Sequence, residues 1–190
     1  MTDIQVISKL SNDFIDSIVL PEGTRGQPIH AFSKPFYLVL ENCKYTVSSN
    51  YGEKSYLSFE LSNEALEIVK AIEDTVVKRA QRDARFSVLD NVKMTPKTWD
   101  KYWRPSVDST NAVLKVTLKD TTQIFSNDKT PTSIGFMKMA STVNLLVTPT
   151  NFWCMNGRVG ISWVVQQIRL LDTCKTDNSE KWEMEEDDDY

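Results

Sequence analysis

The stretch FYLVLENCKYTVSSNYGEKSYLSFEL, residues 36–61, decides the fold class of this chain. Residues 36–47 are rich in β-branched and aromatic side chains, which predicts a long strand. Residues 48–54 contain an asparagine and a glycine near their centre and predict a turn. Residues 55–61 alternate apolar with polar side chains, at the period of a half-buried strand. The stretch therefore predicts a β-hairpin.

A helix is predicted directly after this hairpin. Ser62 or Asn63 provides an N-cap, and apolar side chains recur at the helical period as far as Ala80. The far end of the helix is crowded with basic residues, which suits the helix macrodipole. Contact with phosphate groups is the alternative role of this basic end. The basic residues are Lys78, Arg79, Arg82 and Arg85.

Three further strands are predicted, over residues 112–119, 142–149 and 159–171. The first has one apolar and one basic face, and Trp163 in the last is predicted to be a core residue. The stretches without such patterns are predicted to be loops or irregular connections: residues 21–35, 90–111 and 121–133. This inventory predicts a mainly β fold, a closed five-stranded barrel of the OB type with one packed helix. A β-sandwich is the alternative that periodicity leaves open.

The composition limits the class of protein. The chain has 190 residues, of which 41% are hydrophobic and 25% charged, so it has the composition of a globular domain. No apolar run reaches the roughly 18 residues of a membrane span, and we expect no secretory signal. Cys43, Cys154 and Cys174 match neither a disulfide framework nor a metal site. We therefore expect free thiols, no bound metal and an intracellular, reducing compartment.

Catalysis finds little support in the sequence. No phosphate-binding loop, dinucleotide-binding glycine motif, zinc-protease motif or nucleophile elbow occurs. His30 is the only histidine and has no partner motif, which favours an ordinary loop or strand-edge position over a catalytic one. We expect no catalytic residues and no cofactor. A metal-dependent enzyme acting on nucleic acid is the remaining enzymatic alternative.

Charge is segregated along the chain. Residues 177–190 hold eight acidic residues and one basic residue, a net charge of −7, whereas residues 1–176 carry a net charge of +3. Blocks of like charge repel and form solvated tails. Trp182, Met184 and Tyr190 lie among the acids, which favours a docking peptide over a tail that only improves solubility. We expect one folded domain over residues 1–176 and a disordered acidic tail over residues 177–190.

A basic and aromatic segment, KTWDKYWRP at residues 97–105, predicts nucleic-acid binding. Aromatic rings stack on unpaired bases, and cations between them neutralise phosphates, so single strands are the expected ligand. The alternative is that these rings belong to the core, but three large rings within five residues are not all expected to point inward. Basic residues of residues 112–119 and before the last strand extend the prediction. The predicted contacts are Trp99, Lys101, Tyr102, Trp103, Arg104, Lys115, Lys119 and Arg158.

The tail and the basic segment carry opposite charges, which suggests how they act together. A flexible peptide of net charge −7 mimics a phosphate backbone. Without nucleic acid, the tail is expected to occupy the basic groove of its own chain or of a neighbour. DNA would displace the tail and free it for a basic partner. Binding of DNA in the groove and exposure of the tail would then be linked. A structural or adaptor protein that uses the tail without binding nucleic acid is the alternative function.

The C-terminal part of the chain resembles a known family. Trp153, Gly157, residues 160–163 and residues 165–169 form the pattern W…G..GISW.VQQIR, and residues 185–190 end the acidic tail on an aromatic. These features resemble the OB-fold single-stranded DNA-binding proteins of short-tailed phages and their relatives in large nucleocytoplasmic DNA viruses. The rest of the chain matches by the order of its elements.

The resemblance implies a role in viral DNA replication, recombination or repair. In that family the barrel binds single strands without sequence preference, and homodimers are common. The tail contacts replication proteins such as DNA polymerase and competes with DNA. The implied location is the host cytoplasm or nucleus, where viral DNA replicates. The chain ends in Tyr190, where phage members usually have phenylalanine. The implied partner-binding residues are Glu185, Glu186, Asp187, Asp188, Asp189 and Tyr190.

Overall fold

The predicted hairpin is present and is longer than its prediction. In a computed structural model of the chain, strand β4 (Phe36–Tyr51) pairs antiparallel with strand β5 (Lys54–Glu60), and Tyr51 faces Lys54 across the turn. Gly52 lies in this turn with a φ of 58°, a conformation that favours glycine. In β4, alternate residues Phe36, Leu38 and Leu40 are buried, whereas in β5 the consecutive residues Leu57, Ser58 and Phe59 are all buried.

The structure describes residues 5–20, 30–31, 35–89, 92–108, 110–155 and 157–171. Three α-helices lie within these residues: α1 (Asn12–Ser17), α2 (Asn63–Arg82) and α3 (Pro96–Tyr102). The other strands are β1 (Gln5–Ile7), β2 (Ile18–Val19), β3 (His30–Ala31), β6 (Val88–Leu89), β7 (Val92–Lys93), β8 (Val107–Asp108), β9 (Val113–Leu118), β10 (Gln123–Phe125), β11 (Thr142–Met155) and β12 (Arg158–Leu170). Two short 3-10 helices are η1 (Ala84–Phe86) and η2 (Ile134–Phe136).

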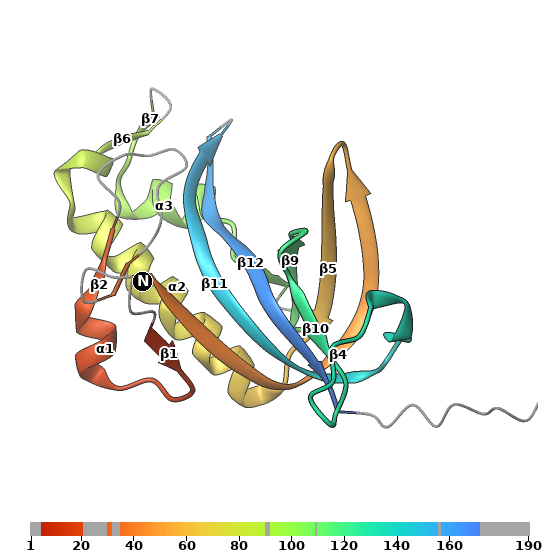
Figure 1. Cartoon of the computed structure of the whole chain (residues 1–190). Helices are drawn as coiled ribbons and strands as arrows, with labels where there is room; N and C mark the ends of the chain where they lie inside the picture. Colours follow the sequence, from red (N-terminus) through yellow and green to blue (C-terminus); the bar gives the residue numbers. More distant parts are fainter. Residues whose placement is uncertain are drawn as a thin grey trace, which may run out of the picture.

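One sheet dominates the molecule, and the described chain is mainly β, as predicted (Figure 1). Its strand order is β10-β12-β11-β4-β5-β9-β8, with β1 beside β4. The hairpin strands β11 and β12 are antiparallel, as are β11 with β4, β4 with β5, and β5 with β9. In addition, β12 pairs in parallel with β9 through Val164 and Thr117. The sheet is strongly curved, with β12 between β11 and β9 in the view of Figure 1.

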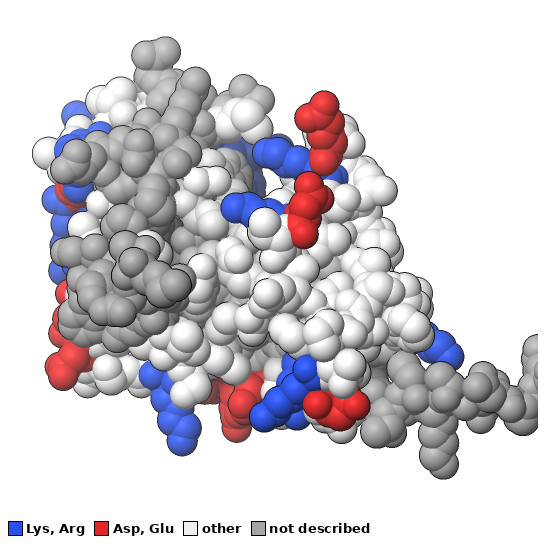
Figure 2. Space-filling model, in the orientation of Figure 1, with Lys and Arg blue, Asp and Glu red and all other residues white. Residues whose placement is uncertain are grey.

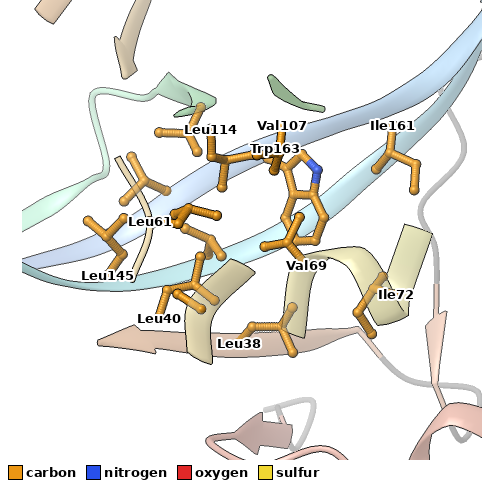
Figure 3. Packing of buried hydrophobic residues seen from close by; sticks show 14 of the residues in the cluster. Leu38, Leu40, Leu61, Val69, Ile72, Val107, Leu114, Leu145, Ile161 and Trp163 are labelled. Carbon is orange, nitrogen blue, oxygen red and sulfur yellow. The ribbon is translucent and has the colours of Figure 1, made fainter. Parts of the chain in front are cut away.

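Helix α2 forms from the predicted capped, amphipathic stretch. The Oγ of Ser62 accepts the N–H of Ala65 at 3.3 Å, which satisfies one free donor of the first turn. Val69 and Ile72 belong to its buried face, and Figure 3 shows Val69 beside the indole of Trp163, with Leu38 of β4 on its other side. Trp163 is 1% exposed, which confirms its predicted place in the core.

Several irregular regions of the prediction contain regular structure. Strand β11 continues to Met155 instead of ending at residue 149, because a register shift between Pro149 and Asn151 accommodates the proline within the pairing. Residues 90–111, predicted to be irregular, contain β7, α3 and β8. Residues 121–133, predicted to be a loop, contain β10, which pairs in parallel with β12. These elements are too short for periodicity to reveal.

Cys43 and His30 were candidates for chemistry outside the basic and aromatic segment. Cys43 is a buried free thiol, and its burial raises the pKa of the thiol to about 12, which keeps it protonated and unreactive. His30 lies in the short strand β3, whose partner is β2. Cys174 lies outside the described residues. In the described part of the chain, no helix combines the length and the apolar character needed to cross a membrane.

Candidate nucleic-acid interface

Helix α3 carries most of the predicted basic and aromatic segment. Thr95 caps it, because its Oγ1 accepts the N–H of Thr98 at 3.2 Å. Pro96 follows in the first turn, where its missing N–H has no partner to lose. The prediction of an irregular segment was wrong here. The helix has only seven residues, too few for a helical period to be visible in the sequence. The threonine and proline at its start are the signal that identifies such a helix.

Trp99 belongs to the core and not to a binding surface. Its side chain is 2% exposed, and its ring lies 6.4 Å from the ring of Phe152 between centroids. The prediction that Trp99 stacks on bases is therefore wrong, because α3 turns this residue toward the large buried area offered by the sheet. Tyr102 and Trp103 are half-buried, and Trp103 packs against the core. At least one fully exposed ring was expected in this segment, and the structure has none among the three.

Tyr102 and Trp103 lie against the turn that joins β11 to β12. The N–H of Arg104 donates to the carbonyl oxygen of Val159 at 2.8 Å, and Trp103 pairs with the same residue. Gly157 has a φ of 67°, and a Cβ at this position would lie 3.0 Å from Cε1 of Tyr102. The edge of the tyrosine ring therefore rests on the backbone of the turn.

Trp153 brings a third half-buried ring to this turn. It faces Gly160 across the β11–β12 ladder. A Cβ on Gly160 would lie 2.5 Å from Cζ2 of Trp153 and 3.0 Å from the carbonyl oxygen of Arg104, so the indole covers the glycine beside the α3 segment. Trp153 is absent from the predicted contacts. Its cross-strand pairing with a glycine in the W…G..GISW pattern is the signal that could have identified it.

Three exposed cations surround these rings. The Nζ of Lys101 lies 5.4 Å from the centroid of the Tyr102 ring, within cation–π range. The Nη1 of Arg104 donates to the carbonyl oxygens of Lys101 and Trp103, at 3.0 and 2.9 Å, which holds its guanidinium beside the segment. Arg158 begins β12. We call this group the hairpin-end surface: Lys101, Tyr102, Trp103, Arg104, Trp153 and Arg158.

Lys115 and Lys119 lie elsewhere, on and after β9. The Nζ of Lys115 lies 4.4 Å from the centroid of the Tyr56 ring on β5, and both lysines are exposed. The N–H of Lys119 donates to Oγ1 of Thr122 at 3.1 Å. In the residues described, no hydrogen bond or ring contact joins either lysine to the hairpin-end surface. The predicted contacts thus form two separate groups.

Charge is distributed unevenly over the face shown in Figure 2. Lys and Arg side chains gather where the upper parts of the β11–β12 and β4–β5 hairpins face each other, and acidic side chains lie beside them. Within the described ranges, no group of three His, Cys, Asp or Glu side chains could hold a metal ion.

A buried carboxylate supports the segment that follows Arg104. Glu73 of α2 is 4% exposed, and its Oε1 accepts the N–H of Ser106 at 2.9 Å. The Oγ of Ser106 accepts the indole N–H of Trp163 at 2.9 Å and donates to the carbonyl oxygen of Ile161 at 3.2 Å. Burial raises the pKa of Glu73, and the hydrogen bonds from Ser106 oppose this rise. These bonds connect α2 and β12 to the backbone next to the hairpin-end surface.

The fold has a counterpart among solved structures. The chain is similar in fold to a phage single-stranded DNA-binding protein. The single-stranded DNA-binding protein from bacteriophage Enc34 superposes with a TM-score of 0.51 at 10% sequence identity, over 86% of this chain and 97% of that chain. Its C-terminally truncated form gives a TM-score of 0.49 at 10% identity, over 82% and 95% of the two chains. Its complex with single-stranded DNA gives 0.48 at 9% identity, over 80% and 94%.

Sequence comparisons add nothing to this likeness, since no family model and no curated protein matches the chain. The predicted resemblance to phage single-stranded DNA-binding proteins is confirmed as a likeness of fold. The predicted relation to proteins of large nucleocytoplasmic DNA viruses and of short-tailed phages stays a prediction. The acidic tail, residues 177–190, lies outside the described residues, so its predicted partner contacts also stay predictions.

Proposed function

We propose that this protein binds single-stranded DNA without sequence preference and without catalysis. The observation that carries the proposal is the hairpin-end surface, where three half-buried rings and three exposed cations share one end of the β11–β12 hairpin. Flat rings stack on any base, and cations neutralise the phosphates between bases. The similarity of fold to the single-stranded DNA-binding protein from bacteriophage Enc34 supports the same function.

The scaffold that we propose for this function is a closed five-stranded barrel of the OB type. Strands β4, β5, β9, β12 and β11 would form it, with the parallel pair Val164 and Thr117 as the closing contact. In OB barrels, loops at one end and one strand face bind oligonucleotides. Lys115 and Lys119, on and after β9, would extend the bound strand beyond the hairpin-end surface.

We propose that residues 1–176 form the binding domain and that residues 177–190 form a competing and docking tail. The tail has a net charge of −7 and the rest of the chain +3, so the tail is suited to occupy the cationic surface that DNA would neutralise. Once displaced, its residues 185–190 would dock on replication proteins such as DNA polymerase. The composition of the tail and its family resemblance support this role.

The biological role that we propose is in viral DNA replication, recombination or repair inside the host cell, with the protein acting as a homodimer. This role rests on the family resemblance of the C-terminal part of the chain. Light scattering of the purified protein tests the dimer directly, and a monomer at all concentrations would contradict it.

The test of DNA binding is a fluorescence anisotropy titration with oligo-dT at two salt concentrations. Tyr102→Ala should weaken binding by about 1–3 kcal/mol, the usual value of one stacked base. Tyr102→Phe keeps the ring and should bind like the wild type. Phe136→Ala removes an exposed ring from η2, away from the hairpin-end surface, and serves as the matched control.

The salt dependence gives a second readout. The logarithm of the association constant should fall linearly with the logarithm of salt concentration, by about 0.7 per phosphate contact. Absence of binding at low salt, even for a chain lacking residues 177–190, would refute the proposal. That result would favour a structural or adaptor protein that acts through its tail.

A further inference from the structure

A basic concavity lies between α1 and the C-terminal end of α2. Among the described residues, its lining includes four cations, Lys78, Arg79, Arg82 and Arg85, and two acids, Asp16 and Asp83, so these residues carry two positive charges in excess. Ile15, Val19 and Leu20 form an apolar part of its wall. Lys and Arg side chains are visible along the edge of Figure 2 that corresponds to this α1–α2 side of Figure 1.

Two of the four cations are committed to the protein. The Nη2 of Arg79 donates to the carbonyl oxygens of Asp16 and Ile15, at 2.7 and 3.3 Å, and so caps the end of α1. The guanidinium of Arg85 forms an ion pair with the carboxylate of Asp83 at 2.6 Å. The side-chain hydrogen bonds from Arg85 lower the pKa of Asp83, which keeps this carboxylate ionised and paired.

The other two cations are free of such partners. Lys78 and Arg82 are exposed, and neither has a hydrogen bond or an ion pair with any residue in the described ranges. Their positions, four residues apart on a helix, place them on the same face. The helix macrodipole favours cations at this end. The hollow also gathers them with Arg79, so two unpaired cations line one concave surface.

We propose that this α1–α2 pocket binds phosphate groups of the same single strand that contacts the hairpin-end surface. Lys78 and Arg82 would each neutralise one phosphate, and the guanidinium of Arg79, held by α1, would border the site. The apolar wall would lie against the sugar and base of the same nucleotide. This inference rests on the proposed function and adds a second contact to the path of the strand.

The experiment compares salt slopes for oligo-dT binding. Lys78→Ala/Arg82→Ala should lower the slope of log K against log[salt] by about 1.4, since each lost phosphate contact of a single strand contributes about 0.7. Lys9→Ala/Lys70→Ala removes the same charge from exposed positions outside the pocket and should leave the slope unchanged. Thermal melting checks that both variants fold. If the alanine variant unfolds, Lys78→Gln/Arg82→Gln removes the charges and keeps long side chains.

Each result decides the proposal. An unchanged slope in the pocket variant, with normal binding by the wild type, overturns the pocket while leaving the proposed function intact. Absence of binding by the wild type overturns both. A titration with inorganic tripolyphosphate distinguishes free polyphosphate from the strand backbone. If tripolyphosphate raises the melting temperature of the wild type but not of the variant, and the slopes are equal, the pocket holds free polyphosphate and the proposed strand contact is wrong.

Discussion

Gly160 occupies a position that has no room for a side chain. The indole of Trp153 lies on one side of it and the carbonyl oxygen of Arg104 on the other. Trp153 and Arg104 both belong to the hairpin-end surface. The packing of Gly160 therefore sets how closely the Trp153 indole approaches the Arg104 backbone. Glycine is needed here because any side chain would collide with Trp153 of β11 or with the backbone at Arg104.

Gly160→Ala should lower the free energy of unfolding by about 1–3 kcal/mol, the usual cost of overpacking. The added methyl would lie 2.5 Å from Cζ2 of Trp153, so the ring or the Arg104 segment must move. Oligo-dT binding should weaken in parallel. Urea unfolding measures the first effect and anisotropy the second. Gly135→Ala is the control, since its nearest neighbour would lie at 3.7 Å, and a Gly160→Ala variant as stable as this control would refute the steric argument.

The raised pKa of Glu73 predicts that the stability of the protein depends on pH. Its pKa in the folded state is raised above the ordinary value of 4.5 by burial. Between the two pKa values, the folded protein binds more protons than the unfolded chain does, so stability falls as pH rises through this window. Above the raised pKa, the folded protein retains a buried carboxylate, whose desolvation is offset in part by the Ser106 N–H.

Glu73→Gln should remove this pH dependence, because the amide does not titrate and its oxygen still accepts from Ser106. The free energy of unfolding of the wild type, relative to Glu73→Gln, should therefore decrease as pH rises from 4.5 toward neutrality. Urea unfolding across this range measures the difference. Relative to Glu73→Gln, Glu73→Ala leaves the Ser106 N–H without its partner and should cost about 1–3 kcal/mol at every pH. A constant difference between the wild type and Glu73→Gln would show that Glu73 titrates normally.

At the scale of elements, α3 determines which ring faces the core and which faces solvent. The helix begins at Pro96 after the Thr95 cap and ends at Tyr102, and the N–H of the following Trp103 donates to the carbonyl oxygen of Trp99 at 2.8 Å. Its single buried side chain, Trp99, anchors it to Phe152 of β11. The short helix therefore places Lys101 and Tyr102 beside the β11–β12 turn, with Arg104 following in the chain.

Thr95→Ala should destabilise α3, because the cap contributes about 1 kcal/mol. Oligo-dT binding should weaken with it, since Tyr102 lies at the end of the same helix. Thr95→Ser keeps a hydroxyl that accepts the Thr98 N–H, and should behave as the wild type. Thermal melting and anisotropy of the three proteins test this. If the alanine variant melts at a lower temperature but binds oligo-dT as well as the serine variant does, α3 does not contribute to DNA binding.

At the scale of the whole molecule, the charge balance reverses between the body and the tail. Residues 1–176 are net positive and residues 177–190 strongly negative. The competition that we propose for a cationic surface depends on this opposition of charge, and salt would screen it. The competition is therefore expected to be strongest at low ionic strength.

Deleting residues 177–190 should tighten oligo-dT binding at low salt, with the difference shrinking as salt is added. A full-length variant in which the eight acids of the tail are replaced by Asn or Gln is the matched control, and should bind as tightly as the deletion does. Anisotropy titrations of the three chains measure the effect. Equal affinities of the wild type and both variants at low salt would show that the tail does not compete.

Local sequence patterns account for much of the scaffold. The alternation over residues 55–61, the Gly52 turn and the Ser62 cap predicted the β4–β5 hairpin and the start of α2, because alternation, turn conformation and capping depend on neighbours along the chain. The same local rules mispredicted the end of strand β11, because a proline such as Pro149 ends a strand in most contexts. Only its bulged pairing with β12 allows β11 to continue.

The sequence by itself determined that this chain is mainly β, which segment is basic and aromatic, and how charge is divided between body and tail. These properties follow from composition and from contacts between near neighbours. Only the tertiary structure decided that Trp99 is a core residue and that Trp153 joins Tyr102 and Trp103. Which face of a short helix is buried depends on the surface that it meets, and that surface comes from β11 and β12, some fifty residues later in the chain.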